Sequence, residues 1–369
     1  MTLNLRNLLE EMIAKDASDL HLTTGVRPKL RVDGELLDAE VDVVLDAKDT
    51  LALAYSVLTE AQKKRFEQED ELDFSFGVQH LARFRGNVFK QRGCVAMAIR
   101  MIPFAVKSFE ELKLPPITAK LAERPRGLVL VTGPTGSGKS TTLAAMIDKI
   151  NKERTGHIIT VEDPIEFIHR HQNCIANQRE VGTDTPSFSS ALKYALREDP
   201  DVILIGEMRD LETISSALTI AETGHLALAT LHTNSAPEAI NRIIDVFPSN
   251  QQSQVRAQLA FVLEGVITQT LLPKLKGRGR VMVAEIMIAT PAIRSVIRDD
   301  KVHQIYSLMQ AGKKHGMQTM NDALYQAYMS RTVAKDDCVR VSPNPSEFLR
   351  SIGETPVEEQ AIGDVRLAR

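Results

Sequence analysis

One octapeptide constrains the fold of this 369-residue chain more than any other feature. It reads Gly-Pro-Thr-Gly-Ser-Gly-Lys-Ser at positions 133–140, between an apolar run, Leu128–Val131, and a segment of helical character, Thr141–Ile150. A glycine-rich turn between a buried strand and a helix start lets backbone N–H groups surround an anion, and the helix dipole adds positive charge. The octapeptide therefore predicts a phosphate-binding loop in an α/β protein. The alternative is a glycine-rich turn with a solvated lysine.

The positions of the predicted loop have distinct roles in holding a nucleotide. Lys139 would reach the β- and γ-phosphates, and the Ser140 hydroxyl would be a ligand of Mg²⁺. The other positions would shape the loop or present backbone N–H groups. The predicted nucleotide-binding residues of this segment are Gly133, Pro134, Thr135, Gly136, Ser137, Gly138, Lys139, Ser140 and Thr141.

The chain around this loop has the pattern of a largely parallel sheet. Short apolar runs alternate with helical segments, as in strands that are buried on both faces. These runs are Leu128–Val131, Ile158–Val161, Val202–Ile205 and Leu226–Leu231. We expect an α/β domain over residues 118–341, with a further helix over Ser253–Leu272, a strand over Val281–Ile288 and a C-terminal helical cap over Pro291–Asp300 and Thr319–Met329. Residues 342–369 have little to bury, which predicts a mobile tail.

Residues 1–102 predict a second, smaller α+β domain. Leucines at helical spacing predict an amphipathic helix over residues 5–13, and Asp33-Gly34 predicts a β-hairpin turn. A helix over residues 48–66 and strands over Asp73–Phe76, Ala82–Phe89 and Val95–Ile102 complete the expected domain. Prolines at 103, 115 and 116 enclose a polar stretch, so we expect a linker over residues 103–117.

Carboxylates follow two of the predicted strands. Glu162 and Glu166 come after Ile158–Val161, and Glu207 follows Val202–Ile205, with Gly206 where a Walker B aspartate usually stands. The carboxyl ends of parallel strands meet at one edge of the sheet, where ligands bind. Glu162 and Glu166 therefore predict a general base and metal-shell groups, and Glu207 a group that holds Mg²⁺ through water or polarises the attacking water. Solvated turn carboxylates and a helix-capping Glu207 are the alternatives.

Two histidines flank the last of these strands. His225 precedes Leu226–Leu231 and His232 follows it. Their opposite parity predicts opposite faces of the strand, so that one senses a γ-phosphate while the other contacts a neighbouring chain or loop. Each histidine alone is more typical of a structural residue, but the phosphate loop and the carboxylates favour the sensor role for His232.

Arginines are crowded near the end of the first domain, which has no phosphate loop of its own. Such arginines would act in trans, because a guanidinium from a neighbouring subunit neutralises charge on a transferred phosphoryl group. Surface ion pairs are the alternative. The candidates are Arg83, Arg85 and Arg100.

Composition argues against several other classes of protein. The net charge of −3, the absence of Trp and the 5% aromatic content argue against a nucleic-acid partner. No apolar run approaches the ~18–20 residues of a membrane span. The N-terminal segment lacks the features of a signal peptide, and the three cysteines form no CxxC pair. We therefore expect a protein of the reducing cytoplasm, without disulfides.

Four motifs together resemble a known family. They are GPTGSGKS at 133–140, VEDPIEF at 161–167, REDPDVILIGEMRD at 197–210 and TGHLALATLHT at 223–233. With these motifs the chain is similar, from about Ala17 to residue 330, to the type IV pilus retraction ATPases of the PilT/PilU group in the secretion ATPase superfamily. The four-cysteine zinc motif that is usual in the pilus extension ATPases is missing.

The resemblance implies an α/β protein with a small PAS-like N-terminal domain and a RecA-like P-loop ATPase domain. It implies ATP and Mg²⁺ as cofactors, and a cytoplasmic homohexamer that works at the inner membrane on a pilus platform protein, with a paralogous retraction ATPase as a further partner. By position in the motifs it implies a catalytic base at Glu166, a Walker B acid at Glu207, and trans-acting arginines among Arg83, Arg85 and Arg100. It also implies a histidine box in which His225 binds the nucleotide and His232 is catalytic.

One further element distinguishes retraction ATPases. Residues 292–299 read AIRSVIRD, which differs at three positions from the AIRNLIRE element of these proteins. Together with the long C-terminal segment, this is similar to PilU, the accessory paralogue. We expect Arg294 and Arg298 to form a charged face for a partner, so that their replacement spares ATP hydrolysis. A core helix with solvated arginines is the alternative at this element. For the whole chain the alternatives are a pilus or secretion assembly ATPase and a RecA-like nucleic-acid translocase.

Overall fold

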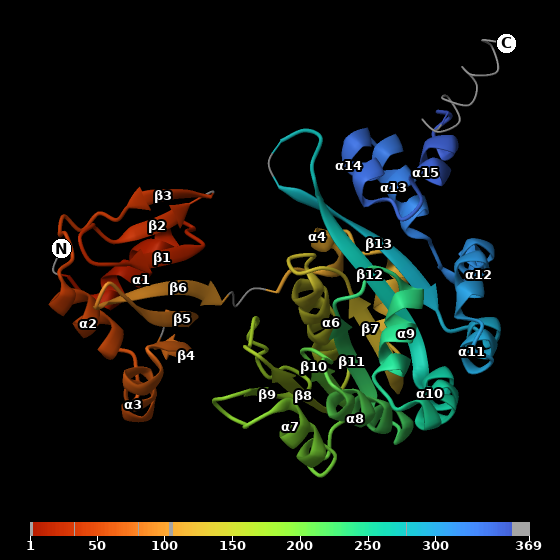
Figure 1. Ribbon diagram of the computed structural model, residues 1–369, viewed down its shortest axis with the longest axis horizontal. Coiled ribbons are helices and arrows are strands. Elements are labelled where there is room, and N and C mark those ends of the chain that lie inside the picture. The colour runs from red at the N-terminus through yellow and green to blue at the C-terminus, as the bar shows by residue number, and fades with distance from the viewer. Residues whose placement is uncertain (1–2, 33, 80, 103–105, 278, 356–369) are drawn as a thin grey trace. The chain divides into compact units, whose positions relative to one another are not determined.

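The computed structural model describes residues 3–32, 34–79, 81–102, 106–277 and 279–355, and the chain divides into two compact units (Figure 1). The N-terminal unit comprises Met1–Ala105 and Pro164–Ile168, and the C-terminal unit comprises Val106–Asp163 and His169–Arg369. The predicted linker, residues 103–117, is not wholly irregular. It contains helix α4 (Phe109–Leu112), because Ser108 and Glu111 form a reciprocal capping box at its start.

The N-terminal unit is built on an antiparallel six-stranded sheet in the order β3-β2-β1-β6-β5-β4. The expected hairpin is present, with Val32 opposite Glu35. The single helix expected over 48–66 is instead two helices, because Thr59 starts a new helix through a capping box with Gln62. The elements are α1 (Leu5–Ala14), β1 (Asp19–Leu22), β2 (Lys29–Val32), β3 (Glu35–Asp38), α2 (Ala47–Tyr55), α3 (Glu60–Glu69), β4 (Glu71–Val78), β5 (Ala82–Gln91) and β6 (Cys94–Ile102).

The C-terminal unit is built on a seven-stranded sheet in the order β13-β12-β7-β11-β10-β8-β9. All neighbouring strands run parallel except β13, which pairs antiparallel with β12 at the edge. The predicted parallel sheet is confirmed. The elements up to β11 are α4, α5 (Pro116–Ala122), β7 (Gly127–Thr132), α6 (Lys139–Glu153), β8 (His157–Glu162), β9 (Ile175–Glu180), α7 (Phe188–Ala195), β10 (Val202–Ile205), α8 (Leu211–Glu222) and β11 (Leu226–Leu231).

The helix expected over Ser253–Leu272 is wrong in its second half. Helix α10 ends at Val262, and the chain continues as strand β12 (Leu263–Pro273) beside β7. The reason is the run Val266-Ile267-Thr268, whose β-branched side chains favour a strand and are buried in the sheet. The remaining elements are α9 (Ala236–Asp245), α10 (Ser249–Val262), β13 (Arg280–Ile288), α11 (Pro291–Arg298), the 3₁₀ turns η1 (Val302–Gln304) and η2 (Lys313–His315), α12 (Ile305–Ala311) and α13 (Met320–Met329).

The expected mobile tail, residues 342–369, is corrected over its first part. Helices α14 (Lys335–Val341) and α15 (Pro345–Ser351) pack beside α13, and Phe348 is completely buried. The Ser342 hydroxyl donates to the Asn321 side chain, which ties the start of this segment to α13. This segment lacks a regular apolar pattern in the sequence. It packs nevertheless, because one large apolar side chain is buried and one buried hydrogen bond holds its start. Residues 356–369 lie outside the described residues.

The apolar core of the C-terminal unit lies on both faces of the parallel strands, where β7, β10 and β11 are buried along their whole length. A search of the described residues for a helix long and apolar enough to cross a membrane found none.

Candidate active site

The phosphate loop lies between the carboxyl end of β7 and the first turn of α6. Gly133, Gly136 and Gly138 have φ angles of 137°, 78° and 89°, a region that side chains with a Cβ disfavour. Gly133 is also held by a close approach, because a Cβ there would lie 2.2 Å from the carbonyl oxygen of Gln269 on β12. The backbone conformation of the loop therefore requires glycine at these three positions, which gives the sequence Gly-x-x-Gly-x-Gly.

The loop has the donors that an anion needs. Helix α6 begins after Gly138 with no side chain capping its first N–H groups. The Ser137 hydroxyl is buried and has no hydrogen-bond partner among the described residues. The Lys139 ammonium donates to the carbonyl oxygens of Gly133 and Pro134, at 2.8 and 3.2 Å. Uncapped amides, a buried hydroxyl and a lysine folded over the loop are a set of groups that fits a nucleotide phosphate chain.

Gln269 was not identified from the sequence, although it holds this loop in place. The side chain is 1% exposed. Its amide donates to the Ser137 carbonyl at 2.8 Å, and its oxygen accepts from the Thr142 hydroxyl at 2.9 Å. In the sequence, the signal for this role is a polar residue inside an apolar strand. The predicted helix over Ser253–Leu272 covers this strand, so the signal could not be recognised.

Glu207 and His232 are brought together at the carboxyl ends of β10 and β11. The Nε2 atom of His232 lies 3.2 Å from Oε1 of Glu207. Arg209 pairs with the same carboxylate, donating from Nη2 to Oε2 at 2.7 Å. Burial acts to raise the pKa of Glu207, but the contacts with Arg209 and His232 outweigh it and lower the pKa. Glu207 is therefore an ionised acid whose partners lie next to the phosphate-binding edge.

The glycine that precedes Glu207 packs directly against β8. A Cβ on Gly206 would lie 3.1 Å from the Val161 carbonyl oxygen and 3.2 Å from Cα of Glu162. These contacts are tighter than side chains normally allow, so the acid at this strand end stands one position later. Asp210, next in the same segment, caps α8 by accepting from the Thr213 amide.

Glu162 and Glu166 lie on and after the carboxyl end of β8. Glu162 is the last residue of β8, and its carboxylate accepts from the Thr160 hydroxyl at 2.6 Å and the Gln178 amide at 3.2 Å. Glu166 is exposed on the segment Pro164–Ile168, which is grouped with the N-terminal unit. Glu162 thus lies at the same sheet edge as Glu207, since β8 and β10 are parallel neighbours.

His225 is not part of this edge in its own chain, contrary to the expectation that it binds the nucleotide. It precedes β11, whose first residue pairs with Gly127 at the start of β7, while the phosphate loop follows the end of β7. Its ring contacts the Thr223 hydroxyl and the Ile220 carbonyl oxygen at the end of α8. The two histidines are separated by the length of β11, and of the two it is His232 that lies at the phosphate-binding edge.

The three candidate arginines lie on one face of the N-terminal sheet. Arg85 of β5 and Arg100 of β6 are directly paired across the strands. Like charges at such positions repel. Arg100 bonds to Asp19 at 2.8 Å, and Arg85 lies 3.6 Å from Asp73. Arg83 donates to the Ser75 hydroxyl. Arg85 and Arg100 are exposed, and each is paired with an aspartate of the same sheet.

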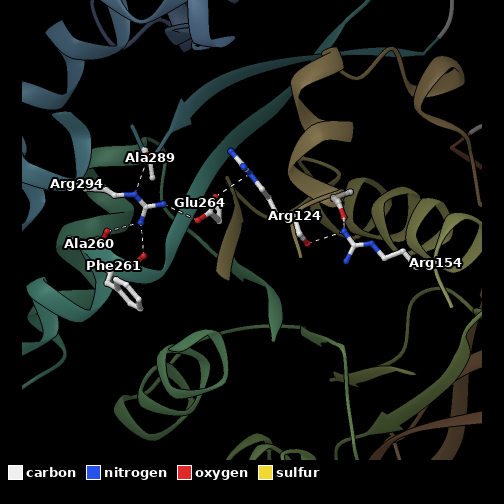
Figure 2. Close-up of polar contacts among 8 residues, drawn as sticks. Arg124, Arg154, Ala260, Phe261, Glu264, Ala289 and Arg294 are labelled. Atoms are coloured by element: carbon white, nitrogen blue, oxygen red, sulfur yellow. Dashed lines mark hydrogen bonds and ion pairs between the residues drawn. The ribbon is translucent and has the colours of Figure 1, made fainter. Parts of the chain in front are cut away.

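The charged face expected on α11 is corrected at Arg294. Figure 2 shows its guanidinium turned inward, toward the end of α10 and the start of β12. It donates to the carbonyl oxygens of Ala260, Phe261 and Ala289 and to the Glu264 carboxylate. Arg294 is a structural cross-link, because three carbonyl groups converge on it, while Arg298 remains exposed.

A phosphate loop on a parallel sheet, with an acid and a histidine at adjacent strand ends, defines a P-loop ATPase. The model of the type II/IV secretion system protein family matches residues 2–340, and the chain belongs to this family. The type IV pilus retraction ATPase PilT of Pseudomonas aeruginosa is 49% identical over 94% of this chain and 100% of its own length. The type IV pilus ATPase PilU of the same organism is 44% identical over 91% and 88%.

The fold agrees with a solved structure of such a relative. The pilus retraction motor PilT with bound ADP aligns with a TM-score of 0.89 and 51% identity, over 94% of this chain and 99% of that one. The predicted resemblance, the fold class and the assignment as an ATPase are confirmed, and nucleotide binding follows from them.

Proposed function

We propose that this chain hydrolyses ATP to power the retraction of type IV pili. The observation that carries the proposal is the contact between Glu207 and His232 beside an uncapped phosphate loop, in a chain 49% identical to a retraction ATPase along that protein's whole length. An acid and a histidine at this edge are suited to respond to the bond between the β- and γ-phosphates.

The residues divide the work of hydrolysis among them. Lys139 and the α6 amides bind the phosphates. The Ser140 hydroxyl and Glu207 would hold Mg²⁺, and the charge of this ion would offset that of the phosphate oxygens. Glu166 is the proposed general base toward the attacking water. Glu162 orients the groups at the carboxyl end of β8. Because Glu207 is paired with Arg209, that ion pair must open when Glu207 turns to water or metal.

The proposed working form is a cytoplasmic homohexamer at the inner membrane, acting on the pilus platform protein. Arg85 and Arg100, with Arg83, supply positive charge to the neighbouring subunit's site. The AIRSVIRD element at 292–299 supports the accessory, PilU-like role, in which the chain works beside a paralogous retraction ATPase.

Deletion of the gene tests this function in cells. Pilus retraction is scored in the deletion strain, in a strain that lacks the paralogue, and in the double deletion. An accessory motor predicts retraction that is weakened by the first deletion and abolished by the third. Unchanged retraction under load in the single deletion, with normal extension, would contradict the proposal. Lys139→Ala in the chromosomal gene should reproduce the deletion, whereas Lys152→Ala, an exposed lysine of the same helix, should not.

A further inference from the structure

A buried carboxylate with no part in the proposed chemistry lies one strand away from the strand that carries Gln269. Glu285 of β13 is 2% exposed. It pairs with Thr268 of β12, and Thr268 pairs with Thr132, the last residue before the phosphate loop. Paired residues lie on the same face of a sheet, and Gln269 lies on the opposite one. Neighbouring positions of one hairpin thus contact the end of β7 on one face of the sheet and the phosphate loop on the other.

On its face of the sheet Glu285 fixes the start of α9. The Ala236 N–H donates to Oε1 of Glu285 at 2.7 Å. Two other bonds at this turn are local: Ser235 accepts from the Glu238 amide, and Glu238 accepts from the Asn234 amide. The local bonds give the turn its shape. The bond to Glu285 ties it to another part of the fold.

The strand that carries this carboxylate holds a second helix. Ile286, the residue after Glu285 on β13, exchanges backbone hydrogen bonds with Gln318, two residues before α13, at 2.8 and 3.1 Å. Figure 1 shows the β12–β13 hairpin running from the parallel sheet toward this helix. Burial raises the pKa of Glu285, while hydrogen bonding from the backbone opposes that rise. Glu285 and the residue after it therefore join the starts of two helices that are far apart in the sequence.

We propose that Glu285 is a positioning residue that carries movement between the C-terminal helices and His232. Only Thr233, Asn234 and Ser235 separate His232 from Ala236, so a shift at the start of α9 moves the imidazole relative to Glu207. A rigid link of this kind lets a change at the nucleotide reach α13, and a load on α13 reach the nucleotide. The proposal rests on the nucleotide site described above.

Glu285→Gln tests the link with little change of volume. A carboxylate is a charged acceptor for the Ala236 N–H, whereas an amide offers one neutral oxygen and turns an NH₂ group toward any donor on its other side. We expect kcat to fall about tenfold while the KM for ATP stays within about twofold, because the phosphate loop is untouched and only His232 is displaced. Wild-type kcat, or a loss of kcat and of ATP affinity together, would overturn the proposal.

Glu264→Gln is the matched control. Glu264 lies on the same hairpin and is also largely buried, but it pairs with Arg124 and Arg294, away from the nucleotide site (Figure 2). We expect this variant to lower the melting temperature and to keep the kcat of the wild type. An equal fall of kcat in both variants would show that any weakening of the hairpin has this effect.

Hydrogen exchange on the wild-type chain gives a test that does not depend on any variant. Binding of a non-hydrolysable ATP analogue should slow exchange at the amides of Ala236 and Gln318 together. In Glu285→Gln the response at Gln318 should disappear while Ala236 still responds. A wild-type response confined to Ala236 would refute the link. A failure of pilus retraction in cells would bear on the proposed function and leave these measurements unchanged.

Discussion

The side-chain amide of Gln269 donates to the carbonyl oxygen of Ser137 across 2.8 Å, joining residues 132 positions apart. The other end of the same side chain accepts from Thr142, in the first turn of α6. The shape of the phosphate loop is therefore set by its own glycines and also by a neighbouring strand.

Replacing Gln269 should loosen the loop. Gln269→Leu leaves the Thr142 hydroxyl and the Ser137 carbonyl without their partner, so we expect the Kd for ATP to rise about tenfold. Titration with a fluorescent nucleotide measures this. The control is Thr268→Val, on the same strand as Gln269. It removes the buried hydrogen bond to Thr132 of β7 and should lower stability without changing the Kd. Equal affinities in all three proteins would rule out a role for Gln269 in shaping the loop.

Glu207→Gln should separate binding from hydrolysis. The amide keeps the volume but not the charge, so ATP should bind as in the wild type while kcat falls about 100-fold or more. Nucleotide titration and phosphate release measure the two effects. Glu212→Gln, at an exposed position of α8, should be silent. If Glu207→Gln fails to bind ATP, then the carboxylate has a structural role instead.

Arg294 and Arg298 should differ sharply in their effect on stability. Arg294→Ala removes four hydrogen bonds and leaves Glu264 without one of its partners, so we expect a loss of about 2 kcal/mol of unfolding free energy. Arg298→Ala should change it by less than about 0.5 kcal/mol, because that side chain is exposed. Urea unfolding compares the two, and similar values would contradict the structural role of Arg294.

Subunit mixing tests the arginines of the N-terminal sheet. If Arg85 or Arg100 completes a neighbour's site, Lys139→Ala subunits and Arg85→Ala/Arg100→Ala subunits should each be inactive alone. Mixed rings should recover part of the activity, because some sites then hold an intact lysine and an intact neighbouring arginine. Activity per subunit should also rise with protein concentration. A concentration-independent rate from monomers would exclude action in trans.

His169 should make the fold sensitive to mild acid. Burial lowers its pKa to about 4, against the opposing charge of Asp148. Below pH 6.5 the His169 imidazole is protonated in the unfolded chain, whereas in the folded chain it stays neutral until about pH 4. The free energy of unfolding should therefore fall by about 3 kcal/mol between these values. His169→Leu should remove this part of the pH dependence, and His303→Gln, at an exposed position, should keep it. Equal pH slopes for wild type and His169→Leu would contradict the assignment.

The sequence was informative where a local pattern carries the structure. The phosphate loop, the buried runs and the acid of β10 could be placed because each depends on neighbours within a few residues. Gln269 and Arg294 could not, since their partners lie about 130 and 30 positions away. His225 shows a limit of motif resemblance: the histidine box implied a nucleotide contact, but His225 precedes β11 and lies at the opposite end of that strand from the phosphate loop.

Gly206 has a consequence for how such a site could have arisen. Because a Cβ at this position would lie 3.1 Å from the Val161 carbonyl oxygen, moving the acid back by one position requires β8 to shift by a few tenths of an ångström. The glycine and the glutamate after it therefore behave as one heritable unit. Stepwise exchange of single residues that began from this arrangement would strain the contact with β8 before it reached the aspartate found in other P-loop enzymes.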